Sequence, residues 1–146
     1  MRLISHRGNL NGPIPEKENH PDYIWEALQA GYDVEIDVWW VDGKFKLGHD
    51  KPQYDFPFSL IERHYNKLWI HCKNMDALSQ LNELDSNGSK LNYFWHENDL
   101  GILTSRGYIW SANLFDRGIL VMPEIYKKEP NENTLGICSD YITKYK

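Results

Sequence analysis

The stretch Asp33-Val34-Glu35-Ile36-Asp37-Val38 is an apolar run that carries two carboxylates, and it predicts a β-strand. Side chains alternate along a strand, so Glu35 and Asp37 share one face and Ile36 takes the other. Two carboxylates on one face repel each other and are costly to bury without a cation between them. The run therefore indicates a site for a divalent cation such as Mg²⁺, Ca²⁺ or Mn²⁺, with a solvent-exposed carboxylate face as the alternative.

Similar apolar runs, each ending in polar or charged residues, recur along the chain. They predict further strands at residues 3–5, 44–47, 68–70, 92–95, 108–110, 119–122 and 137–138. Helical spacing of apolar residues predicts helices at 21–30 and 75–84, the second capped by Asn74, and favours a short helix at 59–65. Asp42-Gly43 predicts a turn between two strands, and residues 112–118 are expected to form a loop.

Strands that alternate with helices indicate an α/β fold with parallel strands. About eight strands with polar residues at their carboxyl ends favour a (β/α)₈ barrel, which ordinarily takes roughly 250 residues. The chain has 146 residues. We therefore expect a single domain over residues 1–146 that forms a compact or reduced TIM (β/α)₈ barrel with several outer helices missing. An open α/β sheet is the alternative.

Composition limits the classes of partner. Hydrophobic residues make up 41% and charged residues 25%, which is typical of a globular chain. The net charge of -5 argues against general nucleic-acid binding but allows a small phosphate-containing substrate. No run reaches the about 18 apolar residues of a membrane span, so we expect no stable membrane insertion. The N-terminus has no apolar signal-peptide region, so a cytoplasmic protein is expected, with Cys72 and Cys138 reduced.

A second strand candidate ends in His71-Cys72-Lys73. His71 and Lys73 share a face by the same alternation, and Cys72 takes the other. A lysine on the inward face of an apolar strand needs an anionic partner, which a phosphate or the carboxylate pair would supply. A solvated lysine at the strand end is the alternative.

His6-Arg7-Gly8 and His49 end two further runs. Arginine directs two donors at a phosphate, and glycine lets the backbone approach closely. Two histidines at strand ends form a candidate acid and base pair, although each alone is more often a structural residue. Carboxylates for a metal, cations for an anion and histidines for protons together indicate phosphodiester cleavage.

The ordered motifs resemble those of the glycerophosphodiester phosphodiesterase family, within the phospholipase-C-like phosphodiesterases. They are His6-Arg7-Gly8, Glu18-Asn19, Glu35-x-Asp37-Val38, Asp42-Gly43, His49-Asp50 and Lys73. The resemblance is strong over residues 3–50 and weaker through Lys73, and residues 136–141 resemble the family's last barrel strand. Several ordered motifs at compatible spacings are more specific than any one of them.

The resemblance implies a TIM-barrel fold, a divalent metal and a role for each matching residue. The implied roles are metal ligation by Glu35 and Asp37, general acid and base catalysis by His6 and His49, phosphate binding by Arg7, and stabilisation of developing negative charge by Lys73. The Glu18-Asn19 pair is expected close to the site.

Three features depart from the family pattern. The family's third metal ligand is a glutamate two residues before the lysine, and this position is His71 here. Imidazole suits Zn²⁺ or Mn²⁺ better than Mg²⁺ or Ca²⁺, so a metal site of Glu35, Asp37 and His71 has a shifted preference, a weaker metal or none. The turn after Val38 is shorter than usual and carries Trp39-Trp40-Val41, and the whole chain is short for the family.

The predicted function is metal-dependent hydrolysis of glycerophosphodiesters or similar small phosphodiesters, with water or a substrate hydroxyl as the attacking group. The alternative is a non-catalytic domain that binds a phosphate ligand, which His71 favours. His96-Glu97 ends another strand candidate, and a structural role is preferred for it over a site role. Missing outer helices would expose apolar strand faces, which favours a homo-oligomer.

Overall fold

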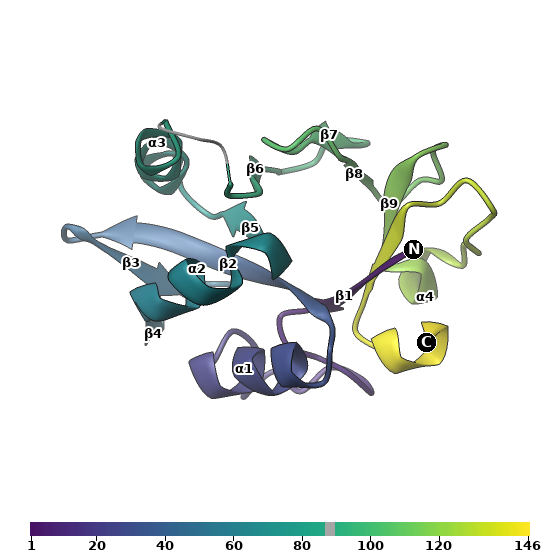
Figure 1. Cartoon of the computed structure of the whole chain (residues 1–146), viewed down its shortest axis with the longest axis horizontal. Helices are drawn as coiled ribbons and strands as arrows, with labels where there is room; N and C mark the ends of the chain where they lie inside the picture. The colour runs from purple at the N-terminus through teal and green to yellow at the C-terminus, as the bar shows by residue number, and fades with distance from the viewer. Residues whose placement is uncertain (87–89) are drawn as a thin grey trace.

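The computed structural model describes residues 1–86 and 90–146, which form a mixed α/β fold with a ten-stranded sheet (Figure 1). The strands are β1 (Arg2–His6), β2 (Asp33–Val41), β3 (Lys44–Leu47), β4 (Tyr54–Asp55), β5 (Leu68–Cys72), β6 (Tyr93–Trp95), β7 (Ile102–Leu103), β8 (Ile109–Ser111), β9 (Gly118–Val121) and β10 (Gly136–Ser139). The helices are α1 (Pro21–Gln29), α2 (Phe58–His64), α3 (Met75–Leu84) and α4 (Pro123–Tyr126), with 3₁₀ turns η1 (Tyr65–Lys67) and η2 (Ile142–Tyr145).

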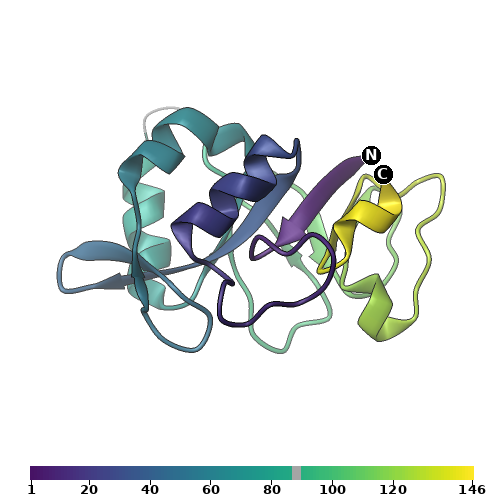
Figure 2. The same cartoon turned by 90° about the horizontal axis from the view of Figure 1, so that it is seen from below.

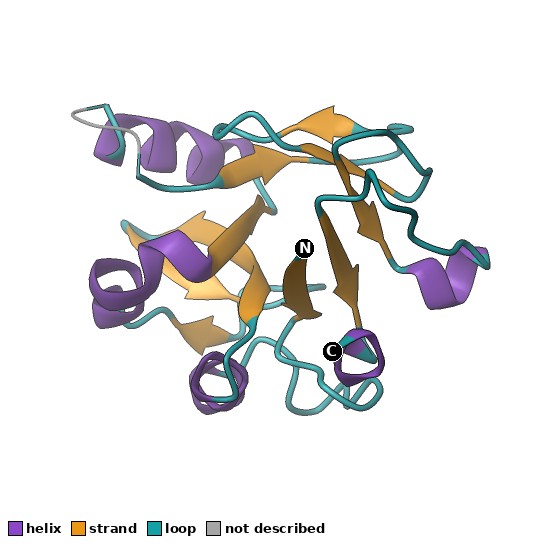
Figure 3. Cartoon of the chain, turned by 45° about the vertical axis from the view of Figure 1, so that its right-hand side comes forward, coloured by secondary structure: helices purple, strands orange, loops and turns teal. Residues whose placement is uncertain are grey.

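The sheet is built on a run of parallel strands that curls on itself (Figure 3). In spatial order this run is β6, β5, β2, β1, β10, β9 and β8. β7 pairs antiparallel with β8. Just after β7, the backbone N–H of Ser105 donates to the carbonyl of Tyr93 at 2.9 Å, and the Ser105 hydroxyl accepts from the Tyr93 N–H. These bonds connect β6 at one end of the run with the connection that precedes β8 at the other.

β2 is long enough to pair differently along its length. Its first residues pair with β1 and its last residues, Val38 to Val41, pair antiparallel with β3. Asp42 and Gly43 join the two strands with φ values of 52° and 74°, the left-handed conformations of a tight hairpin turn. The turn predicted at this pair is therefore confirmed.

Apolar side chains fill both sides of the curled sheet. The larger cluster lies under α1, α2 and α3 and includes Ile24, Ile36, Ile70 and Leu81. A second cluster gathers side chains from six strands of the parallel run: Ile4, Trp69, Phe94, Trp110, Ile119 and Cys138. Ile36 thus packs on the helix-covered side, as the alternation predicted.

Most sequence predictions of elements are confirmed. Each predicted strand and helix has a counterpart whose ends differ by no more than three residues, and Asn74 caps α3 by accepting from the Ala77 N–H at 3.0 Å. β4, β7 and α4 were missed because elements of two to four residues are too short to show a periodicity. Cys72 and Cys138 are buried and unpaired. None of the helices in the described ranges is both long and apolar enough to cross a bilayer.

Candidate functional site

The carboxyl ends of the parallel strands surround a cleft of about 450 Å³. The lining includes six residues singled out from the sequence: His6, Arg7, Glu35, His49, His71 and Lys73. Asp37 lies just beneath, fully buried and in contact with Arg7 and His71. Parallel strands deliver their carboxyl ends to one edge of a sheet, which is why residues far apart in the sequence meet here.

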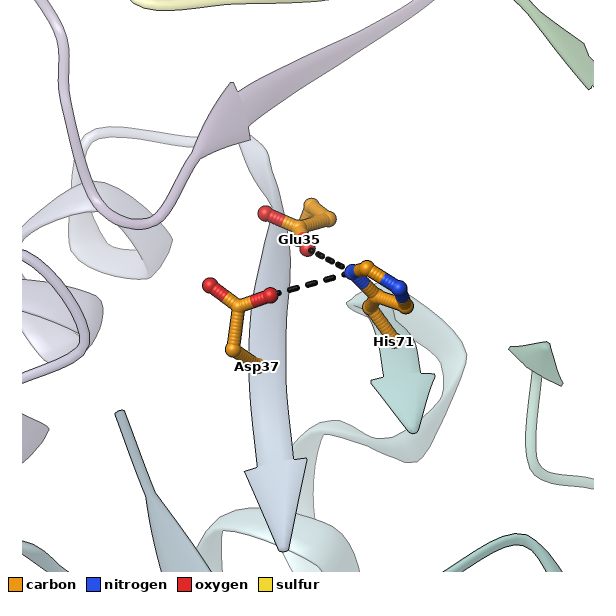
Figure 4. Close-up of side chains that lie close together, drawn as sticks. All are labelled: Glu35, Asp37 and His71. Atoms are coloured by element: carbon orange, nitrogen blue, oxygen red, sulfur yellow. Dashed lines mark hydrogen bonds and ion pairs between the residues drawn. The ribbon is translucent and has the colours of Figure 1, made fainter. Parts of the chain in front are cut away.

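Glu35, Asp37 and His71 converge at the centre of the site (Figure 4). β2 and β5 are neighbours, and Asp37 and His71 are direct partners in their register. His71 Nδ1 lies 3.1 Å from Asp37 Oδ1 and 3.8 Å from Glu35 Oε1. One ligand atom from each residue lies within 4.8 Å of the others. The two carboxylates predicted to share a face therefore do so, with the imidazole beside them.

Polar partners surround the buried Asp37 carboxylate. Arg7 Nε lies 3.0 Å from Asp37 Oδ2, and Asn19 Nδ2 donates to the same oxygen at 2.8 Å. Asn19 Oδ1 also accepts from the Asp37 N–H at 2.9 Å. Burial alone would raise the pKa of Asp37, but the close contact with His71 and the charge of Arg7 outweigh it, so this pKa lies well below its usual range. Asp37 is therefore held as a carboxylate.

Glu35 is buried to 2% exposure with fewer partners. Its Oε2 atom has no hydrogen-bond partner among residues 1–86 and 90–146, and His6 Nε2 lies 3.8 Å away. Burial and the neighbouring charge of Asp37 raise the pKa of Glu35 to about 7. An unpartnered buried carboxylate oxygen beside a second carboxylate and an imidazole fits a divalent cation, because such an ion satisfies all of these acceptors together.

His6 is held by a residue from the other end of the chain. Its Nδ1 lies 2.7 Å from Asp140 Oδ1, directly after β10. Burial lowers the pKa of His6, but the hydrogen bond to Asp140 and the charge of Glu35 outweigh it, so this pKa is raised. Burial would raise the pKa of Asp140, yet the bond to His6 lowers it. Asp140 was missed in the sequence, although its position after a predicted strand was an available signal.

Asn9 and Glu18 connect Arg7 to Asp140. Asn9 is fully buried, and its Nδ2 donates to Asp140 Oδ1 at 2.8 Å and to Glu18 Oε1 at 2.9 Å. Glu18 Oε2 accepts from Arg7 Nη1 at 3.2 Å. The Glu18-Asn19 pair expected near the site is thus in contact with it, Glu18 through Arg7 and Asn19 through Asp37. Asn9 carries no signal of this role in the sequence.

His49 lies at the rim of the cleft and is more exposed than His6. Its side chain is 41% exposed, and its Nδ1 lies 2.7 Å from Asp50 Oδ1. Gly48 sets this position with a φ of 153°, and a Cβ there would overlap the carbonyl oxygen of Lys51. The Gly48 N–H also donates to the carbonyl of Asp37 at 3.1 Å. The turn that carries His49 is therefore tied to the strand of the carboxylates.

Lys73 directly follows β5 and lines the cleft with His71. Its backbone N–H donates to the carbonyl of Val38 at 2.8 Å, which fixes its place beside β2. Within the described ranges no carboxylate oxygen lies within 4.0 Å of its Nζ. The ammonium charge of Lys73 is therefore not neutralised by a close ion pair with a described residue.

His96 and Glu97 also line the cleft, with Glu97 at its exposed rim. The backbone carbonyl of His96 lies 3.2 Å from His71 Nε2. Burial and the charge of His71 lower the pKa of the His96 side chain. Its buried Nδ1 lacks a hydrogen bond to any residue that the structure describes and lies 3.8 Å from Asp99 Oδ2. The sequence did not indicate the backbone contact to His71, because a carbonyl belongs to every residue.

Comparison of the chain with protein-family models, curated proteins and solved structures finds no match. Membership of the glycerophosphodiester phosphodiesterase family accordingly stays a prediction from the sequence motifs, and function is inferred from the geometry of the cleft.

Proposed function

We propose that the protein uses a divalent metal ion to hydrolyse small phosphodiesters, namely glycerophosphodiesters or similar compounds. The observation that carries this proposal is the convergence of Glu35, Asp37 and His71 at a cleft that is also lined by Lys73, His6 and His49. Buried carboxylates bind a cation, and the positive charges of that cation and of Lys73 together favour an anionic substrate.

Glu35, Asp37 and His71 would hold the ion, and the unpartnered Oε2 of Glu35 supports this assignment. When bound, such an ion neutralises a non-bridging phosphate oxygen and polarises phosphorus. Arg7 is oriented by Asp37 and Glu18, and it lines the same cleft as Lys73. These two side chains favour the phosphate group and its developing negative charge.

The two histidines differ in a way that suits opposite proton transfers. Asp140 accepts from Nδ1 of His6, which leaves Nε2 as the working nitrogen, and the raised pKa of His6 favours proton donation. His6 would then protonate the leaving alkoxide. His49, at the open rim, would take the proton of the attacking water or substrate hydroxyl. Attack by a substrate hydroxyl gives a cyclic phosphate in place of the hydrolysed product.

We further propose that the curled sheet is a reduced (β/α)₈ barrel. Its parallel strands follow chain order from β1 through β2, β5 and β6, and then from β8 through β10 back to β1. The bonds between Ser105 and Tyr93 support closure at β7. Loops and the four-residue α4 stand where outer helices would lie between β6 and β10, which accounts for the short chain.

The test is a screen of the full chain against glycerophosphocholine and bis(p-nitrophenyl) phosphate. Hydrolysis should vanish in chelator and return with an added divalent ion, and Asp37→Ala should remove it. His49→Ala should lower the rate at least about a hundredfold, the low end for a proton-transfer residue. Full activity in chelator contradicts the metal role. Binding of phosphate esters without turnover would favour the non-catalytic domain, for which His71 in place of a carboxylate is the supporting feature.

A further inference from the structure

Both ring nitrogens of His71 face hydrogen-bond acceptors. Nε2 lies 3.2 Å from the carbonyl oxygen of His96, and Nδ1 lies 3.1 Å from Asp37 Oδ1. A carbonyl oxygen can only accept, so Nε2 carries a proton. The ring is also fixed in orientation, because it stacks on Phe94 with an interplanar angle of 8° and centroids 5.2 Å apart. Nδ1 is therefore held toward the two carboxylates.

A proton or a cation must lie between Nδ1 and the carboxylate oxygens. Asp37 Oδ1 and Glu35 Oε1 are acceptors at 3.1 and 3.8 Å from Nδ1, and all three atoms would otherwise repel. A proton on Nδ1 would make His71 an imidazolium, and a metal ion would bind the Nδ1 lone pair. The Glu35 carboxylate favours the ion: its Oε1 lies 3.8 Å from Nδ1, too far for a hydrogen bond, and its Oε2 is buried without a hydrogen bond from any described residue, so a proton on Nδ1 would serve Asp37 and leave Glu35 unpaired.

The arrangement around His71 is that of a metal ligand with its outer partner in place. Metal-binding histidines generally donate their other ring N–H to a carboxylate, a carbonyl or water, and this bond fixes the tautomer. The carbonyl of His96 occupies that position here. The cleft beside the three side chains leaves room for a further ligand, as in catalytic zinc sites with three protein ligands and an open position.

We infer that the ion of this site is Zn²⁺ or a similar first-row transition ion rather than Mg²⁺ or Ca²⁺, bound through Nδ1 of His71 with the Nε2 proton held by the His96 carbonyl. The inference rests on the metal site of the proposed function and names the class of ion that the site takes. The physical reason is that imidazole suits Zn²⁺, whereas Mg²⁺ and Ca²⁺ take oxygen ligands. Zn²⁺ binds most sites more tightly than Mn²⁺, so the diagnostic quantity is the change in the Zn²⁺ to Mg²⁺ affinity ratio when His71 alone is changed.

Calorimetric titration of the full chain with Zn²⁺ and with Mg²⁺ measures this ratio in the natural protein and in variants. His71→Glu supplies a third carboxylate and should lower the ratio at least about tenfold, while His71→Gln should weaken Zn²⁺ at least about tenfold. The matched control is His64→Ala, which removes an imidazole in α2 that does not line the cleft, and it should change Zn²⁺ affinity less than about twofold. Circular dichroism melts establish that each variant is folded, and His71→Gln decides the question if His71→Glu does not fold.

Nitrogen NMR of histidine-labelled protein identifies the ligand atom. With one equivalent of Zn²⁺, His71 should retain its proton on Nε2 and show a metal-bound Nδ1. Unchanged Zn²⁺ affinity in both His71 variants would overturn the inference, as would a His71 doubly protonated at saturating Zn²⁺. The proposed function can fail separately. If the chain shows the expected metal preference but hydrolyses no phosphodiester, the proposed function is wrong and this inference stands. If the chain hydrolyses phosphodiesters but its metal binding does not depend on His71, only this inference is wrong.

Discussion

Residues 1–84 and residues 90–146 build their halves of the sheet in different ways (Figure 2). The first half carries α1, α2 and α3, and its longest strand, β2, has nine residues. The second half has strands of two to four residues and the four-residue α4. It also exposes large apolar side chains, namely Leu100, Leu103, Leu114, Phe115, Ile125 and Tyr126. Self-association through such a surface stays a prediction.

The two halves also contribute differently to the cleft. Most side chains of the candidate site come from the first half, where helices pack against β2 and β5. The second half adds the carboxylate of Asp140 behind His6 and the backbone carbonyl of His96 behind His71. The difference teaches that most side chains of the proposed site come from the longer, helix-covered part of the sheet, while residues that follow two short strands of the second half contact His6 and His71 from behind.

The largest effect is expected from the first half at Asp37. Asp37→Asn removes a charge that Arg7, Asn19 and His71 all contact, so kcat/KM for a phosphodiester should fall at least about a thousandfold, or about 4 kcal/mol. Asp116→Asn makes the same chemical change in an exposed loop of the second half and should alter kcat/KM less than twofold. Equal losses of kcat/KM in both variants would contradict the different roles of the two halves.

The difference in packing predicts a difference in stability. Leu81 in α3 is 0% exposed, and Leu81→Ala should lower the free energy of unfolding by about 2–5 kcal/mol. Leu103 in β7 is 68% exposed, and Leu103→Ala should change it by less than about 0.5 kcal/mol. Denaturant unfolding of both variants measures the two values. A large loss at Leu103 would mean that its side chain is covered in solution.

Asp140 tests the contribution of the second half to the chemistry. Asp140→Asn removes the charge that holds His6 Nδ1, so kcat should fall about tenfold to a hundredfold. The pKa of His6, followed by NMR, should fall as well, because the bond to Asp140 raises it. A purely structural role for Asp140 would lower activity and leave the pKa of His6 unchanged.

The smallest expected effect is the pH dependence of the same pair. Folding lowers the pKa of Asp140 from 3.8, so the Asp140 carboxylate stabilises the folded chain above pH 3.8, and this contribution is lost as the pH falls through the lower pKa of the folded state. Folding raises the pKa of His6 from 6.5, so the protonated His6 stabilises the folded chain below pH 6.5, and this contribution is lost as the pH rises through the higher pKa of the folded state. The unfolding free-energy difference between the natural chain and Asp140→Asn should therefore be greatest between about pH 4 and 6.5. A difference that grows steadily above that window would contradict the ionic pairing.

The elements that were predictable are those with a repeating local pattern. β2 and α3 followed from alternation and from helical spacing, and the cap at Asn74 followed from its residue type. β7 and α4 did not, because two and four residues hold too little pattern and their form depends on neighbouring strands. Closeness of Glu35 and Asp37 was predictable for the same local reason.

The sequence by itself determined which chemical groups the strands carry: carboxylates in β2, an imidazole and a lysine at the end of β5, and His6 at the end of β1. Tertiary structure alone decided their partners. Asp140 meets His6 across 134 positions of chain, and the His96 carbonyl, directly after the neighbouring strand β6, lies 3.2 Å from His71 Nε2. The physical reason is range: backbone alternation acts over a few residues, whereas strand pairing brings together groups that no local rule relates.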